Sequence, residues 1–119
     1  IVRGTTSGQI VGLLREAGAK EIHMRISAPP FRNPCYYGTD IDSREHLIAC
    51  RHSVPEIARI IGADTLGYLP MEDLKELIGC REYCDACFSG NYPTEIPESF
   101  EKDHFEAPLS RRKPKGERK

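Results

Sequence analysis

Apolar residues near the start of the chain recur at helical spacing. The positions that form this pattern are Ile10, Val11, Leu13, Leu14 and Ala17. Gly18 follows where a left-handed C-terminal cap belongs, and residues 21–27 then alternate polar and apolar side chains, as a strand does. Because Ile1 and Val2 precede the helix as the end of a strand would, the pattern indicates a strand, helix, strand unit. Such units build parallel sheets, so we assign the chain to the α/β class.

The pattern then becomes mainly helical. Residues 31–42 have neither helical nor strand periodicity, so we expect an irregular loop at the carboxyl edge of the sheet, where ligands bind. A capping box at Ser53 and Glu56 opens one of the helices that follow. The helices predicted after the loop cover residues 43–49, 54–61 and 71–78, and a short strand is predicted over residues 63–69.

These elements divide the chain into three parts. Residues 1–42 form the end of an α/β core, residues 43–92 form a helical segment that contains cysteines, and residues 93–119 form a tail. From Glu95 onward Pro, Glu and Lys are frequent and periodicity disappears, so we expect disorder. The last nine residues are basic, which we interpret as a solvated end of the chain, and we predict no nucleic-acid partner.

Length and composition narrow the class of protein further. With 119 residues, 39% of them apolar, the chain fits one modest domain. It contains no apolar run of the roughly 20 residues that span a bilayer, and no signal peptide, so we expect a soluble cytoplasmic protein without a membrane partner. The first residue is Ile1 and not Met, which suggests a fragment of a longer protein.

The first residues suggest a phosphate-binding loop. Gly4 permits a tight turn, and hydroxyl groups follow at the start of the predicted helix, where backbone N–H groups lack intrahelical acceptors. A phosphate group fits such a site. An ordinary helix cap has the same residue types, and from the residues alone the two interpretations are about equally supported. The candidate residues are Arg3, Gly4, Thr5, Thr6 and Ser7.

The chain has five cysteines, and the spacing of two of them suggests a metal or redox site. Cys84 and Cys87 form a C-x-x-C pair, which can place two thiolates on one ion or cluster. Cys35 is the best third ligand, because it lies in an irregular segment between aromatic residues. Cys50, at the end of a predicted helix, is interpreted as a packed small hydrophobe. The four histidines have no suitably spaced partner and are interpreted as structural or solvated.

Cys80 leaves two further metal sites open. The spacing of Cys80, Cys84 and Cys87 also occurs where three cysteines hold a radical-type four-iron cluster, but such loops come early in a long barrel. A zinc site made with Cys35 is the stronger rival. The two metals differ in colour, because an iron–sulfur protein is brown and a zinc–thiolate protein is colourless.

Three separated segments closely resemble glutamine phosphoribosylpyrophosphate amidotransferases of the iron–sulfur type. They are Ile1 to Ser7, the loop from Ala28-Pro29-Pro30 to Cys35-Tyr36-Tyr37-Gly38, and the run from Tyr83 to Pro93 that contains both residues of the C-x-x-C pair. The segments agree with the family in order and spacing, and the resemblance covers about residues 1–96. It implies the last part of a phosphoribosyltransferase-type parallel sheet with flanking helices.

The resemblance also implies a reaction and its site residues. Ammonia released from glutamine attacks C1 of phosphoribosyl pyrophosphate (PRPP) and gives 5-phosphoribosylamine, the first step of purine synthesis. The loop from Arg3 to Ser7 is then expected to hold the 5-phosphate, and Cys35, Cys84 and Cys87 to be three of four ligands of a 4Fe-4S cluster.

Other parts of the family site are expected upstream of this chain. They are the fourth cluster ligand, the nucleophilic cysteine of the glutaminase domain and the acidic pair that contacts the ribose and Mg²⁺-bound substrate. We therefore expect the fragment alone to be inactive and its full-length parent to be a homo-oligomer. The alternative is a stand-alone zinc or iron–sulfur module without catalysis, in which the first loop only caps a helix.

Overall fold

The computed structural model describes residues 1–41, 43–79 and 83–96. The predictions made for Cys80 and for residues 97–119 of the tail lie outside these residues. The elements, in chain order, are α1 (Thr5–Glu16), β1 (His23–Ile26), the 3-10 helix η1 (Arg44–His46), α2 (Ile48–Arg51), α3 (Val54–Ile61), β2 (Thr65–Tyr68), α4 (Met71–Ile78) and α5 (Ala86–Ser89). No helix in the described part of the chain is long and apolar enough to cross a membrane.

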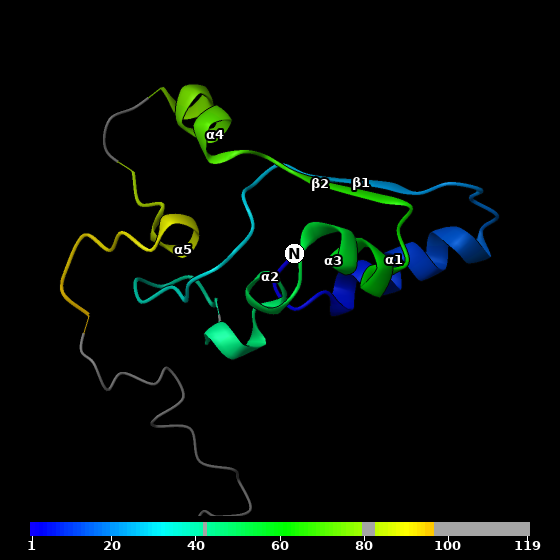
Figure 1. Cartoon of the computed structure of the whole chain (residues 1–119), viewed down its shortest axis with the longest axis horizontal. Helices are drawn as coiled ribbons and strands as arrows, with labels where there is room; N and C mark the ends of the chain where they lie inside the picture. Colours follow the sequence, from blue (N-terminus) through cyan, green and yellow to red (C-terminus); the bar gives the residue numbers. More distant parts are fainter. Residues whose placement is uncertain (42, 80–82, 97–119) are drawn as a thin grey trace, which may run out of the picture.

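The strands β1 and β2 pair in parallel, which confirms the α/β class. Their register runs from His23 opposite Thr65 to Ile26 opposite Tyr68. Figure 1 shows α1, α2 and α3 on one side of this strand pair, while α4 and α5 lie beyond one of its ends. A parallel pair needs a long crossover, and here the crossover contains the irregular loop and three of the short helical elements.

The predicted opening strand is not observed. Ile1 and Val2 have no strand partner among the described residues, and the carbonyl oxygen of Val2 instead accepts a hydrogen bond of 2.9 Å from the backbone N–H of Ile48. This bond places α2 directly against the segment that precedes α1.

A small apolar core lies between the strand pair and the helices. Its buried members are Val11, Ile22, Ile48, Ile57, Ile61 and Ala63. Ile57 and Ile61 come from α3, whose Gly62 ends the helix with a φ of 80°, as predicted. The predicted capping box is also present, since the carboxylate of Glu56 accepts bonds from both the backbone N–H and the hydroxyl of Ser53. The core therefore fixes α1 and α3 beneath the sheet.

The helix predicted over residues 43–49 is wrong in detail. The backbone of Leu47 is extended, so the region forms η1 and the single turn of α2 instead of one helix. Leu47, at the interruption, is completely buried. The bounds predicted for α3 and α4 agree with the structure, whereas both strands are shorter than predicted.

Asp64 connects the C-terminal end of α1 with the starts of both strands. Its carboxylate accepts hydrogen bonds from the backbone N–H of Ile22 at 2.7 Å and from the guanidinium of Arg15. Arg15 also donates to the carbonyl oxygens of Ala19 and Lys20. The bond from Ile22, together with the nearby Arg15, lowers the pKa of Asp64 below its ordinary value.

Candidate functional site

Gly4 forms the N-cap of α1 in a left-handed conformation, with a φ of 91°. A Cβ atom at this position would stand 2.9 Å from Cδ1 of Ile48, so both the backbone angle and the close packing favour glycine. The first helical hydrogen bond runs from the N–H of Gly8 to the carbonyl oxygen of Gly4, at 2.9 Å. Helix α1 therefore begins abruptly, and the amides of its first turn point out of the N-terminal end.

No side chain caps this end of α1, and its first turn has no acidic residue. An ordinary side-chain cap, the competing interpretation of the sequence, is therefore not what the structure contains. Thr5 and Thr6 are exposed and Ser7 is half-buried, so their hydroxyl groups stand beside the amides. The positive end of the helix dipole is accessible to an anion, and this geometry suits a phosphate group.

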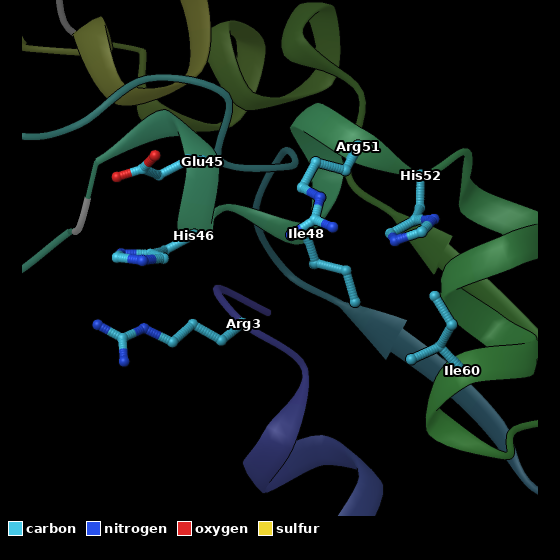
Figure 2. Close-up of a pocket in the computed structure, with 7 residues that line it drawn as sticks. All are labelled: Arg3, Glu45, His46, Ile48, Arg51, His52 and Ile60. Carbon is cyan, nitrogen blue, oxygen red and sulfur yellow. The ribbon is translucent and has the colours of Figure 1, made fainter.

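Arg3 lies at a surface pocket of about 290 Å³ beside the loop. The residues that line this pocket are Arg3, Glu45, His46, Ile48, Arg51, His52 and Ile60. Figure 2 shows Arg3 and His46 on one side, with Arg51, His52 and the two isoleucines opposite them. The spacing of the histidines and of Arg51 in the sequence did not indicate that they would gather beside Arg3. The hydrogen bond between Ile48 and Val2 brings them there.

The structure also brings the cysteine segments together. The carbonyl oxygen of Cys87 accepts hydrogen bonds from the backbone N–H groups of Arg32 and Asn33, both at 3.0 Å. Cys35 and Cys87 are half-buried, Cys84 is exposed, and none of the three is part of a disulfide. Burial, followed by the neighbouring Cys35 and Cys84, raises the pKa of the Cys87 thiol. Among residues 1–41, 43–79 and 83–96, no three His, Cys, Asp or Glu side chains form a group that could hold a single metal ion.

Two findings differ from what the sequence predicted for the cysteines. Cys50 is exposed, and its thiol donates to the carbonyl oxygen of Arg32 at 3.1 Å, so it is not packed in the core. In α2 the buried position is Ile48, while the Cys50 side chain lies toward the irregular loop that contains Arg32. The short helix α5, which begins between Cys84 and Cys87 at Ala86, was not predicted.

Cysteine thiolates are nevertheless the ligand type that iron–sulfur clusters use. Cys35 and Cys84 lie near Cys87, and their charge raises the cost of ionising the Cys87 thiol. A positively charged metal centre would remove that cost, because metal coordination favours the thiolate form.

The fold and the site together define a class of protein. It is an α/β protein with a parallel strand pair and a helix that begins at a glycine without a side-chain cap. It matches part of the phosphoribosyltransferase fold in two solved structures, each 52% identical to the chain. One is glutamine PRPP amidotransferase from B. subtilis complexed with ADP and GMP, with a TM-score of 0.77 over 89% of this chain and 25% of that one. The other is the structure of the allosteric regulatory enzyme of purine biosynthesis, with a TM-score of 0.79 over 92% of this chain and 25% of that one.

Sequence relatives identify the same enzymes. The chain is 58% identical over 100 residues to the chloroplastic amidophosphoribosyltransferase of Glycine max, which covers 82% of this chain and 18% of the relative. It is 56% identical over 103 residues to the Bacillus subtilis enzyme, covering 81% and 21%, and 54% identical over 101 residues to that of Archaeoglobus fulgidus, covering 82% and 22%. No protein-family model matches the chain.

Most of the chain is therefore homologous to one segment of the amidophosphoribosyltransferases, as the resemblance in the sequence indicated. The chain spans about a fifth of the length of these relatives.

Proposed function

We propose that these residues form the 5-phosphate-binding and cluster-binding segment of an amidophosphoribosyltransferase. The complete enzyme would convert PRPP and glutamine into 5-phosphoribosylamine. The observation that carries the proposal is the N-terminal end of α1, where a left-handed Gly4 exposes uncapped amides beside three hydroxyl residues. The homology to amidophosphoribosyltransferases supports PRPP as the phosphate compound.

The role of the loop is to position the substrate. The amides of the first turn and the hydroxyls of Thr5, Thr6 and Ser7 would bind the 5-phosphate, and Arg3 would add positive charge. A fixed phosphate holds the ribose, so that ammonia meets C1 in one orientation and at one distance. The loop contains no general base, and none is required of it, because its task is orientation.

Arg51 and His52 support the same assignment from outside the loop. They line the pocket next to Arg3 and add positive charge or hydrogen-bond donors to this side of the molecule. A surface of this kind attracts a highly charged anion such as PRPP and raises its local concentration. Mg²⁺, when bound, would neutralise charge on the pyrophosphate leaving group, and we expect its ligands outside these 119 residues.

Cys35, Cys84 and Cys87 would hold three irons of a 4Fe-4S cluster. The fourth ligand would come from another part of the complete protein. The hydrogen bonds that join the Cys87 backbone to the loop before Cys35, and the absence of a disulfide at all three cysteines, support this assignment. The homo-oligomeric state and the cytoplasmic location stay predictions.

Catalysis should require parts of the amidophosphoribosyltransferases that lie outside the segment matched by this chain. The relatives are about five times as long as the part that matches. We therefore expect no 5-phosphoribosylamine from PRPP and ammonia when the 119-residue chain is assayed alone. Formation of that product by the chain would contradict this part of the proposal.

A titration of the chain with ribose 5-phosphate, followed by ³¹P NMR, tests the phosphate site directly. We expect a saturable shift of the phosphate resonance with the unmodified chain. Thr6→Glu should abolish the shift, because its carboxylate would occupy the anion site, while a negative charge in the first turn stabilises the helix. Loss of binding would then not reflect unfolding of α1.

Thr6→Gln is the matched control, since it has the same shape without the charge. It should bind ribose 5-phosphate more weakly than the unmodified chain but far better than Thr6→Glu. Equal binding by the glutamate and glutamine variants would exclude the N-terminal end of α1 as the phosphate site.

A further inference from the structure

Aromatic side chains join the two segments that carry the cysteines. The rings of Phe31 and Phe88 stack with centroids 5.0 Å apart. Tyr92 contacts both Tyr36 and Tyr37, at centroid distances of 5.2 and 6.3 Å. We call these five residues the aromatic clasp. One side of the clasp flanks Cys35 and the other flanks Cys87, so the rings span the gap between the two segments.

Tyr92 forms a hydrogen bond beside Cys35 from the second cysteine segment, whereas the backbone N–H of Cys35 donates to the carbonyl oxygen of Ile41 within its own loop, at 3.3 Å. The hydroxyl of Tyr92 donates to the carbonyl oxygen of Pro34 at 2.8 Å, and Pro34 is buried. That carbonyl belongs to the peptide unit that continues into Cys35. The hydroxyl of Tyr37 has a different partner, the hydroxyl of Thr94, at 2.8 Å. Tyr92 therefore restrains the backbone at Cys35, whereas Tyr37 restrains the chain after the C-x-x-C pair.

We infer that Tyr92 is a positioning residue that places Cys35 beside Cys84 and Cys87 before any metal binds. The inference deepens the proposed function and rests on its assignment of the three cysteines to one cluster. All of the contacts that carry it join protein groups to one another. They are the clasp, the bond from Tyr92 to Pro34 and the two bonds to the carbonyl oxygen of Cys87.

Such an arrangement lowers the entropic cost of assembling the site. Cys35 is separated from Cys84 by a long stretch of sequence, and closing so long a loop costs conformational entropy. Where the clasp has already closed the loop, metal binding need not supply that free energy. The position of the thiols is then a property of the apo-protein, and ligands placed in advance bind their metal more tightly.

The rest of the fold does not depend on Tyr92. None of the buried core residues beneath the strand pair belongs to the clasp. A Tyr92 variant should therefore keep the α/β part folded, and far-UV circular dichroism can verify this in each variant.

A bifunctional thiol reagent applied to the metal-free chain tests the inference. The chain would carry Cys50→Ser and Cys80→Ser, which leaves only the three cysteines of interest. Mass spectrometry would then measure the rate at which Cys35 is joined to Cys84 or Cys87. We expect Tyr92→Phe to lower this rate about fivefold, the usual effect of one lost hydrogen bond, and Tyr92→Ala to lower it further.

Tyr37→Phe is the matched control, because it removes a hydroxyl from the same clasp without touching Pro34. Its cross-linking rate should stay within about twofold of that of the parent chain. A rate that is the same in the parent chain, Tyr92→Phe and Tyr92→Ala would overturn the inference, as would a parent chain in which Cys35 forms no cross-link.

Iron and sulfide content after reconstitution separates this inference from the proposed function. If the cross-linking rate depends on Tyr92 and the chain also binds iron and sulfide with brown colour, both stand, and Tyr92→Phe should bind less iron at limiting concentration. If the rate depends on Tyr92 but neither this chain nor a full-length protein that contains it binds iron, the cluster assignment fails while the positioning role remains.

Discussion

The phosphate loop stands on a packed core, whereas the cysteine segments are joined by aromatic rings and hydrogen bonds. A Cβ atom at Gly4 would meet Ile48 and Ile61, both of which belong to the buried cluster beneath the strands. Cys35 and Cys87 instead lie half-buried beside the aromatic clasp, away from that cluster. A core is cooperative, so the loop shares the stability of the whole α/β part. The cysteine region depends on a few separate contacts, and each can be removed alone.

The largest expected effect comes from Ile57→Ala, which leaves a cavity in the core. Ile57 has no exposed surface, and such truncations lower the free energy of unfolding by about 2 to 5 kcal/mol. Urea unfolding monitored by circular dichroism measures the loss. Ile60→Ala, in the same helix but 54% exposed, should change it by less than about 0.5 kcal/mol. Similar losses in the two variants would show that the core is not packed as described.

Gly4→Ala should have the next largest effect, because it forces a side chain into the left-handed conformation. The expected cost is about 1 to 3 kcal/mol, with loss of ribose 5-phosphate binding in the NMR titration. Gly12→Ala is the control, since it lies inside α1 and its Cβ would meet no atom within 4 Å. It should stabilise the chain by about 0.5 to 1 kcal/mol. Slower cross-linking of the cysteines in Gly4→Ala would contradict the independence of the cysteine region from the phosphate loop.

Phe88→Leu should loosen the cysteine region without affecting the core. Losing the stacked contact with Phe31 should cost about 0.5 to 1.5 kcal/mol locally. The measurement is the alkylation rate of Cys87, which should rise relative to that of exposed Cys50. Phe88→Tyr keeps the ring and should leave the ratio unchanged. An unchanged ratio in Phe88→Leu would show that the stack does not protect Cys87.

The smallest effect concerns the pH dependence of the α/β part. Because the fold lowers the pKa of Asp64 from 3.8, its contribution to stability is complete above that value. The contribution is lost as the pH falls through the lower pKa of the folded state. Asp64→Asn should therefore be less stable than the parent at neutral pH. This difference in stability should disappear as the pH falls below 3.8. Thermal unfolding of both proteins across this pH range measures the difference. A difference in stability that does not change with pH would contradict the role given to the Asp64 carboxylate.

The sequence predicted the parts of the fold that depend on local pattern. Helices α3 and α4 were predicted at their observed bounds, because Ser53, Gly62 and Gly79 mark their ends. The opening strand was not observed, since the identity of Ile1 and Val2 does not determine whether a partner strand is present. The division of residues 43–49 at Leu47 also escaped prediction, because the spacing of apolar residues does not mark the extended backbone there.

In the candidate site, too, local features could be predicted from the sequence and long-range contacts could not. Gly4 and its neighbours could be identified because a helix N-terminal end is local in sequence. The proximity of Cys35 to Cys87 depends on hydrogen bonds from Arg32 and Asn33, and no spacing rule predicts it. The positions of Arg51 and His52 beside Arg3 depend likewise on long-range contacts of Ile48, which bonds to Val2 and packs in the core. Aromatic residues near each cysteine were visible in the sequence, but their pairing was not.

The parallel pairing of β1 with β2 also sets a sequence of events during synthesis. Cys35 lies inside the crossover between the two strands, and the C-x-x-C pair follows β2. As the chain leaves the ribosome from its N-terminal end, β2 becomes available to pair before Cys84 and Cys87 emerge. The contact between the Cys35 loop and the C-x-x-C segment is thus the last long-range contact of the described chain that can form during synthesis.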